Sequence, residues 1–165
     1  NPRILQGMKD QDLLAYIQPV FIDLDMNTVE PAIGAHRMDK VYAWKSMLDM
    51  GIHTSGGSDA PVVSFDAMEN IYFAVTRKNI SGQPQEGWIP SEKISVDEAV
   101  KLFTKNAAYA SYTEKENGTI ETGKNADLVV LEKDIYSIDP DEIKTVKVDM
   151  TVLGGEIVYE REVEE

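Results

Sequence analysis

The pattern of apolar and polar residues predicts alternating strands and helices along the first part of the chain. Residues 13–22 (LLAYIQPVFI) are an apolar run interrupted by proline, which indicates a buried strand that ends in a loop. Asp39 is the expected N-cap of a helix that ends near Met50, with Gly51 as its C-terminal cap. A second apolar run, residues 50–54, follows at once and predicts another strand. The order strand, loop, helix, strand is that of one βαβ unit with parallel strands.

Two more helices are predicted after this unit. The first begins at about Ser64 or Asp66 and ends near Arg77, with its apolar side chains on one stripe. The second begins with Ser95 and Glu98, which have the spacing of a capping box, and extends over residues 96–110.

The pattern changes after Tyr112, where short apolar segments alternate with turn residues. The predicted strands are residues 118–121, 126–131, 144–153 and 156–159. Gly154-Gly155 separates the last two strands and is typical of a two-residue hairpin turn. We therefore predict an α/β body, residues 1–112, followed by an all-β appendix, residues 113–165.

Charge and hydropathy argue against two classes of partner. The chain has 16 basic and 29 acidic residues, a formal net charge of −13 that repels phosphate backbones and anionic membrane surfaces. No apolar run approaches the roughly 20 residues that a membrane-spanning helix needs. We predict neither nucleic acid nor membrane as a partner.

Cysteine and histidine usage limits the chemistry of the chain. Zero cysteines exclude disulfides, thiolate catalysis and cysteine-based metal sites, and are compatible with a reducing cytoplasm, where we place the protein. Only two histidines are present. The chain begins Asn1-Pro2-Arg3, without an initiator methionine or a leader pattern, so we expect it to be a piece of a longer protein.

Asp59 is the first candidate catalytic residue. It lies in Gly56-Gly57-Ser58-Asp59-Ala60-Pro61, directly after the second predicted strand. Catalytic acids of α/β proteins often occupy such a position, where glycines allow close backbone approach at the carboxyl end of a strand. The alternative is an Asx-type turn, in which the carboxylate bonds its own backbone.

Several longer stretches resemble the C-terminal third of metal-dependent amidohydrolases. They are YAWKSMLDMGIHTSGGSDAPV, EGWIPSEKISVDEAVKLFTKNAAYAS, GTIETGKNADLVVLEKD and VLGGEIVYE, and they occur in the same order as in that superfamily. The most similar branch contains N-substituted formamide deformylase and exoenzyme regulatory proteins. The resemblance implies the C-terminal portion of a (β/α)8 TIM barrel plus part of a small β-sandwich domain, with residues 16–21 as strand seven and 52–58 as strand eight.

The same resemblance implies a role for Asp59. In the family, the acid at the end of strand eight touches the metal, accepts the proton of the attacking hydroxide and returns it to the departing amine. The metal is divalent, with zinc as the expectation. The other ligands of the family, histidines of strands one, five and six and a bridging residue of strand four, have no counterpart here. We therefore expect residues 1–165 alone to bind no metal or other cofactor.

The remaining candidates are less specific. In the long predicted loop over residues 23–37, His36 and Arg37 are candidate substrate-binding residues, the alternative being solvated loop residues. Where related sequences have Gln-Pro-x-His, this chain has Phe21 in place of the histidine, so one polar substrate contact is absent. His53 is interpreted as a core histidine, the alternative being a position facing the barrel interior.

We therefore predict a piece of a metal-dependent hydrolase that acts on non-peptide carbon–nitrogen bonds of a small amide, with the isolated piece inactive. The alternatives are a catalytically inactive barrel protein that regulates or binds, and a free-standing α/β interaction domain. Because two strands cannot close a barrel, a strand edge and apolar helix faces would be exposed. We therefore predict a homo-oligomer, which light scattering would test.

Overall fold

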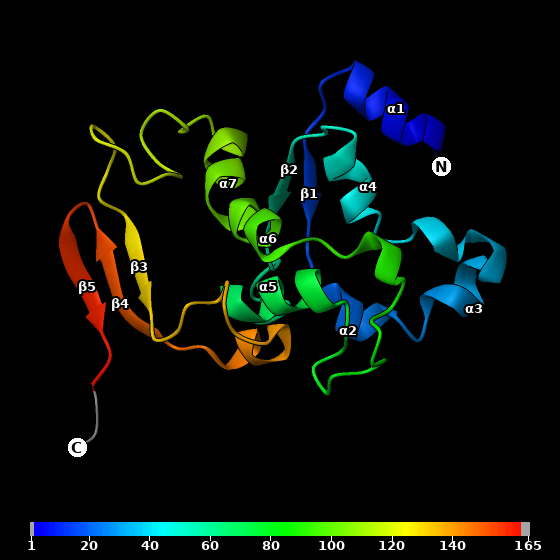
Figure 1. The fold of residues 1–165 in the computed structure, drawn as a ribbon. Coiled ribbons are helices and arrows are strands. Elements are labelled where there is room, and N and C mark those ends of the chain that lie inside the picture. Colours follow the sequence, from blue (N-terminus) through cyan, green and yellow to red (C-terminus); the bar gives the residue numbers. More distant parts are fainter. Residues whose placement is uncertain (1, 163–165) are drawn as a thin grey trace.

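A computed structural model describes residues 2–162, apart from the side chain of residue 40 (Figure 1). No helix in this range is long and apolar enough to cross a membrane. The elements are, in order, α1 (Pro2–Asp10), β1 (Ala15–Ile17), α2 (Phe21–Asp25), α3 (Val29–Ile33), η1 (Ala35–Lys40), α4 (Trp44–Asp49), β2 (Thr54–Gly56), α5 (Ala67–Thr76), η2 (Pro90–Glu92), α6 (Val96–Phe103), α7 (Lys105–Ala110), β3 (Leu128–Leu131), η3 (Pro140–Thr145), β4 (Val148–Leu153) and β5 (Glu156–Glu160). The α labels denote α-helices and the η labels 3-10 helices.

Strands β1 and β2 confirm the predicted βαβ unit. They pair in parallel, with Ala15 opposite Thr54 and Ile17 opposite Gly56, and α4 lies between them in sequence. Pairing continues one residue beyond the strands, because the Gly57 amide donates to the Ile17 carbonyl at 2.9 Å. The carboxyl ends of both strands therefore meet at one edge of this small sheet.

The segment between β1 and α4 differs from the prediction. Instead of a plain loop it contains α2, α3 and η1, and the helix expected to begin at Asp39 begins at Trp44. The physical reason is a remote cap: the buried carboxylate of Glu92 accepts from the Ser46 amide at 2.8 Å and from the Ser46 hydroxyl. A carboxylate at the first turn satisfies free amides and complements the helix dipole, so no local cap is needed.

Helix α5 occupies the centre of the molecule, and α6 and η3 pack against it (Figure 1). Its predicted beginning is confirmed, because the Asp66 carboxylate accepts from the Met68 amide at 2.8 Å. Its apolar side chains face neighbours on more than one side, and the core residues that it contributes are Ile71, Tyr72, Phe73 and Ala74. The helix ends at Thr76, and its C-cap, Arg77, adopts a left-handed backbone conformation.

The predicted helix over residues 96–110 is two helices. Its capping box is confirmed, with Ser95 and Glu98 bonding each other's backbone amides. The break falls at Thr104, whose hydroxyl donates to the Val100 carbonyl at 2.9 Å, an alternative to helical backbone bonding. After the break, Asn106 of α7 donates to the Thr54 carbonyl at 2.9 Å, which fixes α7 against β2.

The last part of the chain forms a three-stranded antiparallel sheet in the order β3-β4-β5. The hairpin at Gly154-Gly155 is confirmed, whereas no strand forms over residues 118–121. There the Lys124 ammonium donates to the Glu114 carbonyl at 2.8 Å and to the Thr119 hydroxyl at 2.6 Å, which holds the segment as a closed loop. The predicted strand over residues 144–153 begins only at Val148, because residues 144 and 145 belong to the 3-10 helix η3.

The fold class is confirmed in its coarse form, a mixed α/β body with a small antiparallel sheet. The described residues contain two parallel strands, which do not close a barrel, and one antiparallel sheet, which is not by itself a sandwich. The segment around η3 packs into the core through Ile135, Ile143 and Val146. The predicted boundary after residue 112 and the predicted oligomer both stay predictions.

Candidate active site

Two loops lie at the edge where β1 and β2 end. We call residues 18–43, between β1 and α4, the β1 loop, and residues 57–66, between β2 and α5, the Asp59 loop. Both are fixed at their beginnings, because the Gly57 amide bonds the end of β1 and the Val20 amide donates to the buried Asn70 side chain of α5 at 3.1 Å. The beginnings of both loops therefore lie at the same edge of the sheet, the edge at which α/β proteins carry their functional side chains.

Asp59 is exposed and follows β2 by three residues, with a left-handed backbone (φ 62°). The tight turn around it is made by its neighbours: the Ala60 amide donates to the Ser58 hydroxyl at 3.3 Å. Within the described residues the Asp59 carboxylate accepts no hydrogen bond and forms no ion pair. The Asx-turn alternative is therefore wrong, since the side chain does not bond its own backbone, and the carboxylate is open to solvent.

Gly56 brings the end of β2 close to α6. A Cβ atom built on Gly56 would lie 2.7 Å from Cζ of Phe103, closer than real contacts allow. The aromatic ring therefore packs directly on the backbone that leads into the Asp59 loop. This contact explains the first glycine of the Gly-Gly pair in physical terms.

His36 and Arg37 lie in η1, on the exposed part of the β1 loop. Nε of Arg37 donates to Nε2 of His36 at 3.3 Å. The structure brings these two candidates together, but records no hydrogen bond or ion pair from either of them to Asp59. Their role in substrate binding stays a prediction.

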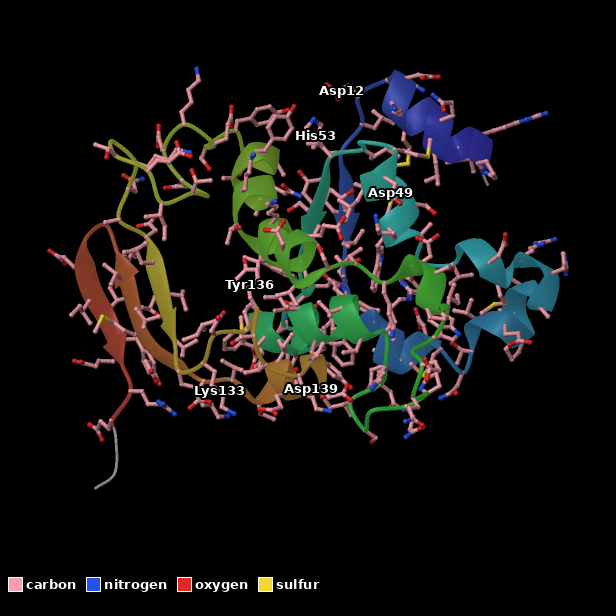
Figure 2. All side chains as sticks on the ribbon, viewed as in Figure 1. Asp12, Asp49, His53, Lys133, Tyr136 and Asp139 are labelled. Atoms are coloured by element: carbon pink, nitrogen blue, oxygen red, sulfur yellow. The ribbon has the colours of Figure 1, made fainter. Side chains whose placement is uncertain are left out.

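The interpretation of His53 as a core residue is wrong. His53 precedes β2 and is exposed, and its ring stacks on Tyr109 of α7 at a centroid distance of 4.2 Å. Its carbonyl accepts from the Ala15 amide, and Figure 2 shows His53 near Asp12 at the amino ends of β1 and β2. This is the end of the sheet opposite the Asp59 loop. The alternation of side chains along a strand does not apply before the strand begins.

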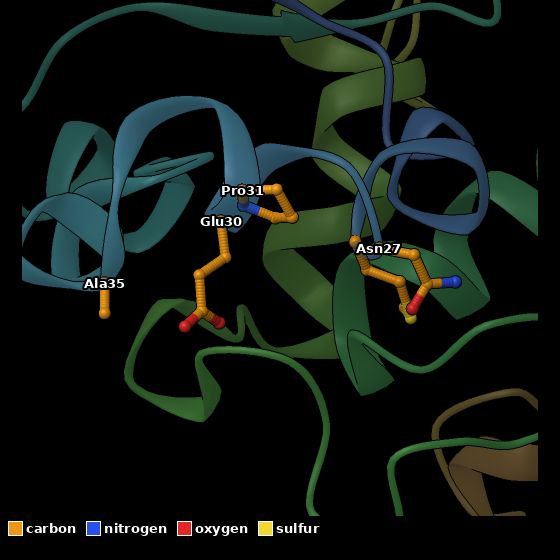
Figure 3. A pocket seen from close by; sticks show the side chains of 5 residues that line it. Asn27, Glu30, Pro31 and Ala35 are labelled. Atoms are coloured by element: carbon orange, nitrogen blue, oxygen red, sulfur yellow. The ribbon is translucent and has the colours of Figure 1, made fainter.

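The β1 loop also bounds a surface pocket of about 440 Å³ (Figure 3). The residues that line it are Met26, Asn27, Glu30, Pro31 and Ala35. In Figure 3 the Glu30 side chain extends between Asn27 and Ala35. Glu30 is the one ionisable side chain of this lining, and none of the three predicted site residues belongs to it. The pocket alone has no catalytic constellation.

The described residues do not make a metal site by themselves. They contain no group of three or more His, Cys, Asp or Glu side chains placed to hold a metal ion. A zinc site takes at least three protein ligands, and Asp59 would supply one. The expectation that residues 1–165 alone bind no metal stays a prediction.

A buried charged cluster, not predicted from the sequence, lies at the end of the β1 loop. The Arg77 side chain is fully buried, with its guanidinium carbon 4.7 Å from the Trp44 ring centroid and 5.7 Å from that of Trp88. Burial lowers the pKa of Arg77 to about 10, while the negative charge of Glu92 acts in the opposite direction. Arg77 stays charged at neutral pH. The aromatic rings and three backbone carbonyls replace its water.

Tyr42 completes this Arg77 cluster. Its ring packs on Trp44 at 5.6 Å and on Trp88 at 5.8 Å, and its hydroxyl donates to the Asp25 carboxylate of α2. Burial, and then the hydrogen bond to Asp25, raise the pKa of Tyr42 above its ordinary range. The phenol is therefore a neutral donor at every pH at which the protein would be used.

The family model for the amidohydrolase family matches residues 2–159. The chain belongs to the amidohydrolase family. Among curated relatives, the chain is 39% identical over 145 residues to YtcJ of Bacillus subtilis (strain 168), which is named as an amidohydrolase; the match covers 88% of this chain and 27% of YtcJ. It is 37% identical over 122 residues to N-substituted formamide deformylase of Arthrobacter pascens, covering 74% of this chain and 22% of that enzyme.

Solved structures agree with the family. This amidohydrolase chain superimposes on a metal-dependent hydrolase from Pyrococcus horikoshii OT3 with a TM-score of 0.75 at 20% identity, over 85% of this chain and 28% of that one. At this identity the match shows the fold alone. The chain spans about a quarter of the length of these relatives.

Proposed function

We propose that the whole protein containing these residues is a metal-dependent hydrolase that cleaves non-peptide carbon–nitrogen bonds of small amides. The observation that carries the proposal is the exposed, unpartnered carboxylate of Asp59, at the carboxyl edge of two parallel strands in a chain of the amidohydrolase family. An acid held on a sharp turn without protein partners is available to a substrate.

Asp59 has the chemistry of a proton carrier in this proposal. Water adds its oxygen to the amide carbon, the carboxylate takes a proton from that water, and the proton passes to the nitrogen as the carbon–nitrogen bond breaks. A divalent metal, when bound, supplies acidity to the water and polarises the carbonyl. Its ligands, apart from Asp59, would come from parts of the whole protein other than residues 2–162.

The substrate class is supported by one relative. N-substituted formamide deformylase is by its name an enzyme of N-substituted formamides, and the identity of 37% covers the Asp59 loop and the helices behind it. We therefore propose a small amide as the substrate, with His36 and Arg37 as candidate contacts in the β1 loop. A cytoplasmic location fits a cysteine-free chain of this charge.

Removal of the metal tests this function. The whole protein is assayed with a panel of N-substituted formamides and other small amides. After dialysis against a chelator its rate of hydrolysis is expected to fall by at least about 100-fold, because the metal activates the water. Addition of zinc is expected to restore the rate. Circular dichroism before and after dialysis provides the control for folding. Hydrolysis that survives complete removal of the metal would contradict the proposal, and a metal-loaded protein that hydrolyses no amide would favour the regulatory alternative.

A further inference from the structure

Arg77 is a charged residue that has no role in the proposed chemistry. Its side chain is fully buried and its backbone is left-handed (φ 52°), so both the side chain and the backbone carry a cost. A buried charge is seldom the most stabilising choice, because a well-packed apolar residue often does as well. We therefore expect the contacts of Arg77 to fix the relative placement of chain segments and not mainly to stabilise the fold.

The guanidinium of Arg77 joins the end of α5 to two other segments. Its Nη1 and Nη2 atoms donate to the carbonyls of Tyr42 and Val41, at 3.0 and 3.2 Å. Its Nε donates to the Trp88 carbonyl, and the Trp88 amide donates back to the Arg77 carbonyl, both at 2.6 Å. Val41 and Tyr42 are at the very end of the β1 loop, so Arg77 fixes the point at which the loop returns to the core.

The beginning of the β1 loop is fixed to the same cluster. The Tyr42 hydroxyl bonds Asp25 in α2, and the Asp23 carboxylate accepts from the Ile80 amide at 2.8 Å. Residues 26–40 thus emerge between two anchored ends and include the pocket of Figure 3 together with His36 and Arg37. Most of these residues are exposed, and their placement depends on the anchors.

We propose that Arg77 is a positioning residue for substrate binding, which fixes the end of the β1 loop and thereby the placement of residues 26–40, with the candidate substrate contacts His36 and Arg37. The inference rests on the proposed function, since it takes the β1 loop as part of the substrate site. Arg77 itself is buried and touches no substrate.

The geometry requires arginine at this position. Three carbonyls from two segments are satisfied by one planar group with several N–H donors in fixed directions, and the same plane packs over two indole rings. Lysine would keep the charge but cannot reproduce this fork. Arg77→Lys is therefore the variant that separates the anchoring of the loop from the mere presence of a cation.

The test compares the wild-type whole protein with its Arg77→Lys variant by hydrogen–deuterium exchange and by kinetics. Exchange of the amides of residues 26–40 is expected to rise by about tenfold or more, with a smaller change in α6, because the loop loses its anchor. With an amide substrate, KM is expected to rise by about tenfold and kcat to change by less than about threefold, the pattern of lost ground-state binding.

Two further variants keep the inference falsifiable. Arg161→Lys makes the same substitution in a surface arginine paired with Glu132 and Asp149, and should change neither quantity. Tyr42→Phe removes only the bond to Asp25 and should also raise exchange over residues 26–40. If Arg77→Lys fails to fold, the exchange of Tyr42→Phe tests the inference in its place. Exchange that is unchanged, or raised equally along the chain, or a raised exchange with unchanged KM, would overturn the inference.

Failure of this inference and failure of the proposed function remain distinguishable. Exchange reports on the anchor without any substrate. If the protein hydrolyses an amide but residues 26–40 are indifferent to Arg77→Lys, the inference fails and the function stands. If no amide is hydrolysed, the proposed function fails, and with it the substrate-binding part of this inference.

Discussion

Replacing Asp59 with asparagine is expected to lower kcat/KM of the whole protein by about 10³-fold, within the range for loss of a general acid–base group. Asparagine has nearly the same shape and tolerates the left-handed backbone (φ 62°) that Asp59 adopts. It cannot accept a proton from water at neutral pH. Steady-state hydrolysis of the best amide substrate measures the effect.

Asp12→Asn is the matched control. Asp12 is also exposed and also left-handed (φ 52°), but it precedes β1 and therefore lies at the opposite end of the sheet (Figure 2). We expect kcat/KM within about twofold of the wild type, since surface changes away from a site have little effect. Equal losses in the two variants, or a fully active Asp59→Asn protein, would show that Asp59 is not the proton carrier.

Gly87→Ala is expected to lower the free energy of unfolding by about 3 kcal/mol or more, through backbone strain added to overpacking. Gly87 is buried with φ +80°, and a Cβ atom there would lie 2.3 Å from the Thr76 carbonyl oxygen and 2.8 Å from Cε of Lys93. Trp88, the next residue, is held by a backbone bond to Arg77 and by a bond from the Arg77 Nε atom, which oppose a shift of the backbone. Urea unfolding, followed by circular dichroism, measures the loss.

Gly82→Ala separates the two causes in the same segment. Gly82 has nearly the same φ, +83°, but a Cβ atom there would have no neighbour within 4 Å. Its loss should therefore be the backbone strain alone, about 1–2 kcal/mol. If the two variants unfold at the same urea concentration, the close contact at Gly87 does not exist in solution.

Local sequence signals predicted the elements whose causes are local. Asp66 caps α5 with its own carboxylate, Ser95 and Glu98 cap each other, and the Gly154-Gly155 turn closes its hairpin. In each case donor and acceptor lie within a few residues, so the pattern is readable from the chain.

The incorrect predictions have causes that the pattern of apolar residues does not show. The beginning of α4 depends on Glu92, which bonds Ser46 from 46 residues away. The break at Thr104 accompanies a hydroxyl bond within the helix, and the bonds of Lys124 hold the predicted strand over residues 118–121 in a loop. Helical periodicity and β-branched composition do not encode these interactions.

The candidate site also contains one feature with a local sequence signal and one without. The position of Asp59 on a turn after β2 could be predicted, because a strand followed by a glycine-rich turn is a local pattern, whereas its catalytic role stays a prediction. The Arg77 cluster could not, because the guanidinium reaches Tyr42 and Val41 at separations of 35 and 36 residues. The sign of it in the sequence is an arginine that closely follows the apolar segment over residues 71–75.

We propose that the Asp59 carboxylate belongs to a metal centre at the shared edge of β1 and β2. Anomalous diffraction from crystals of the whole protein, collected at the absorption edge of its bound metal, would locate that metal. We predict a peak within coordination distance of an Asp59 carboxylate oxygen, about 2.0–2.2 Å for zinc. A fully occupied metal centre elsewhere in the protein, with Asp59 turned away from it, would contradict the claim.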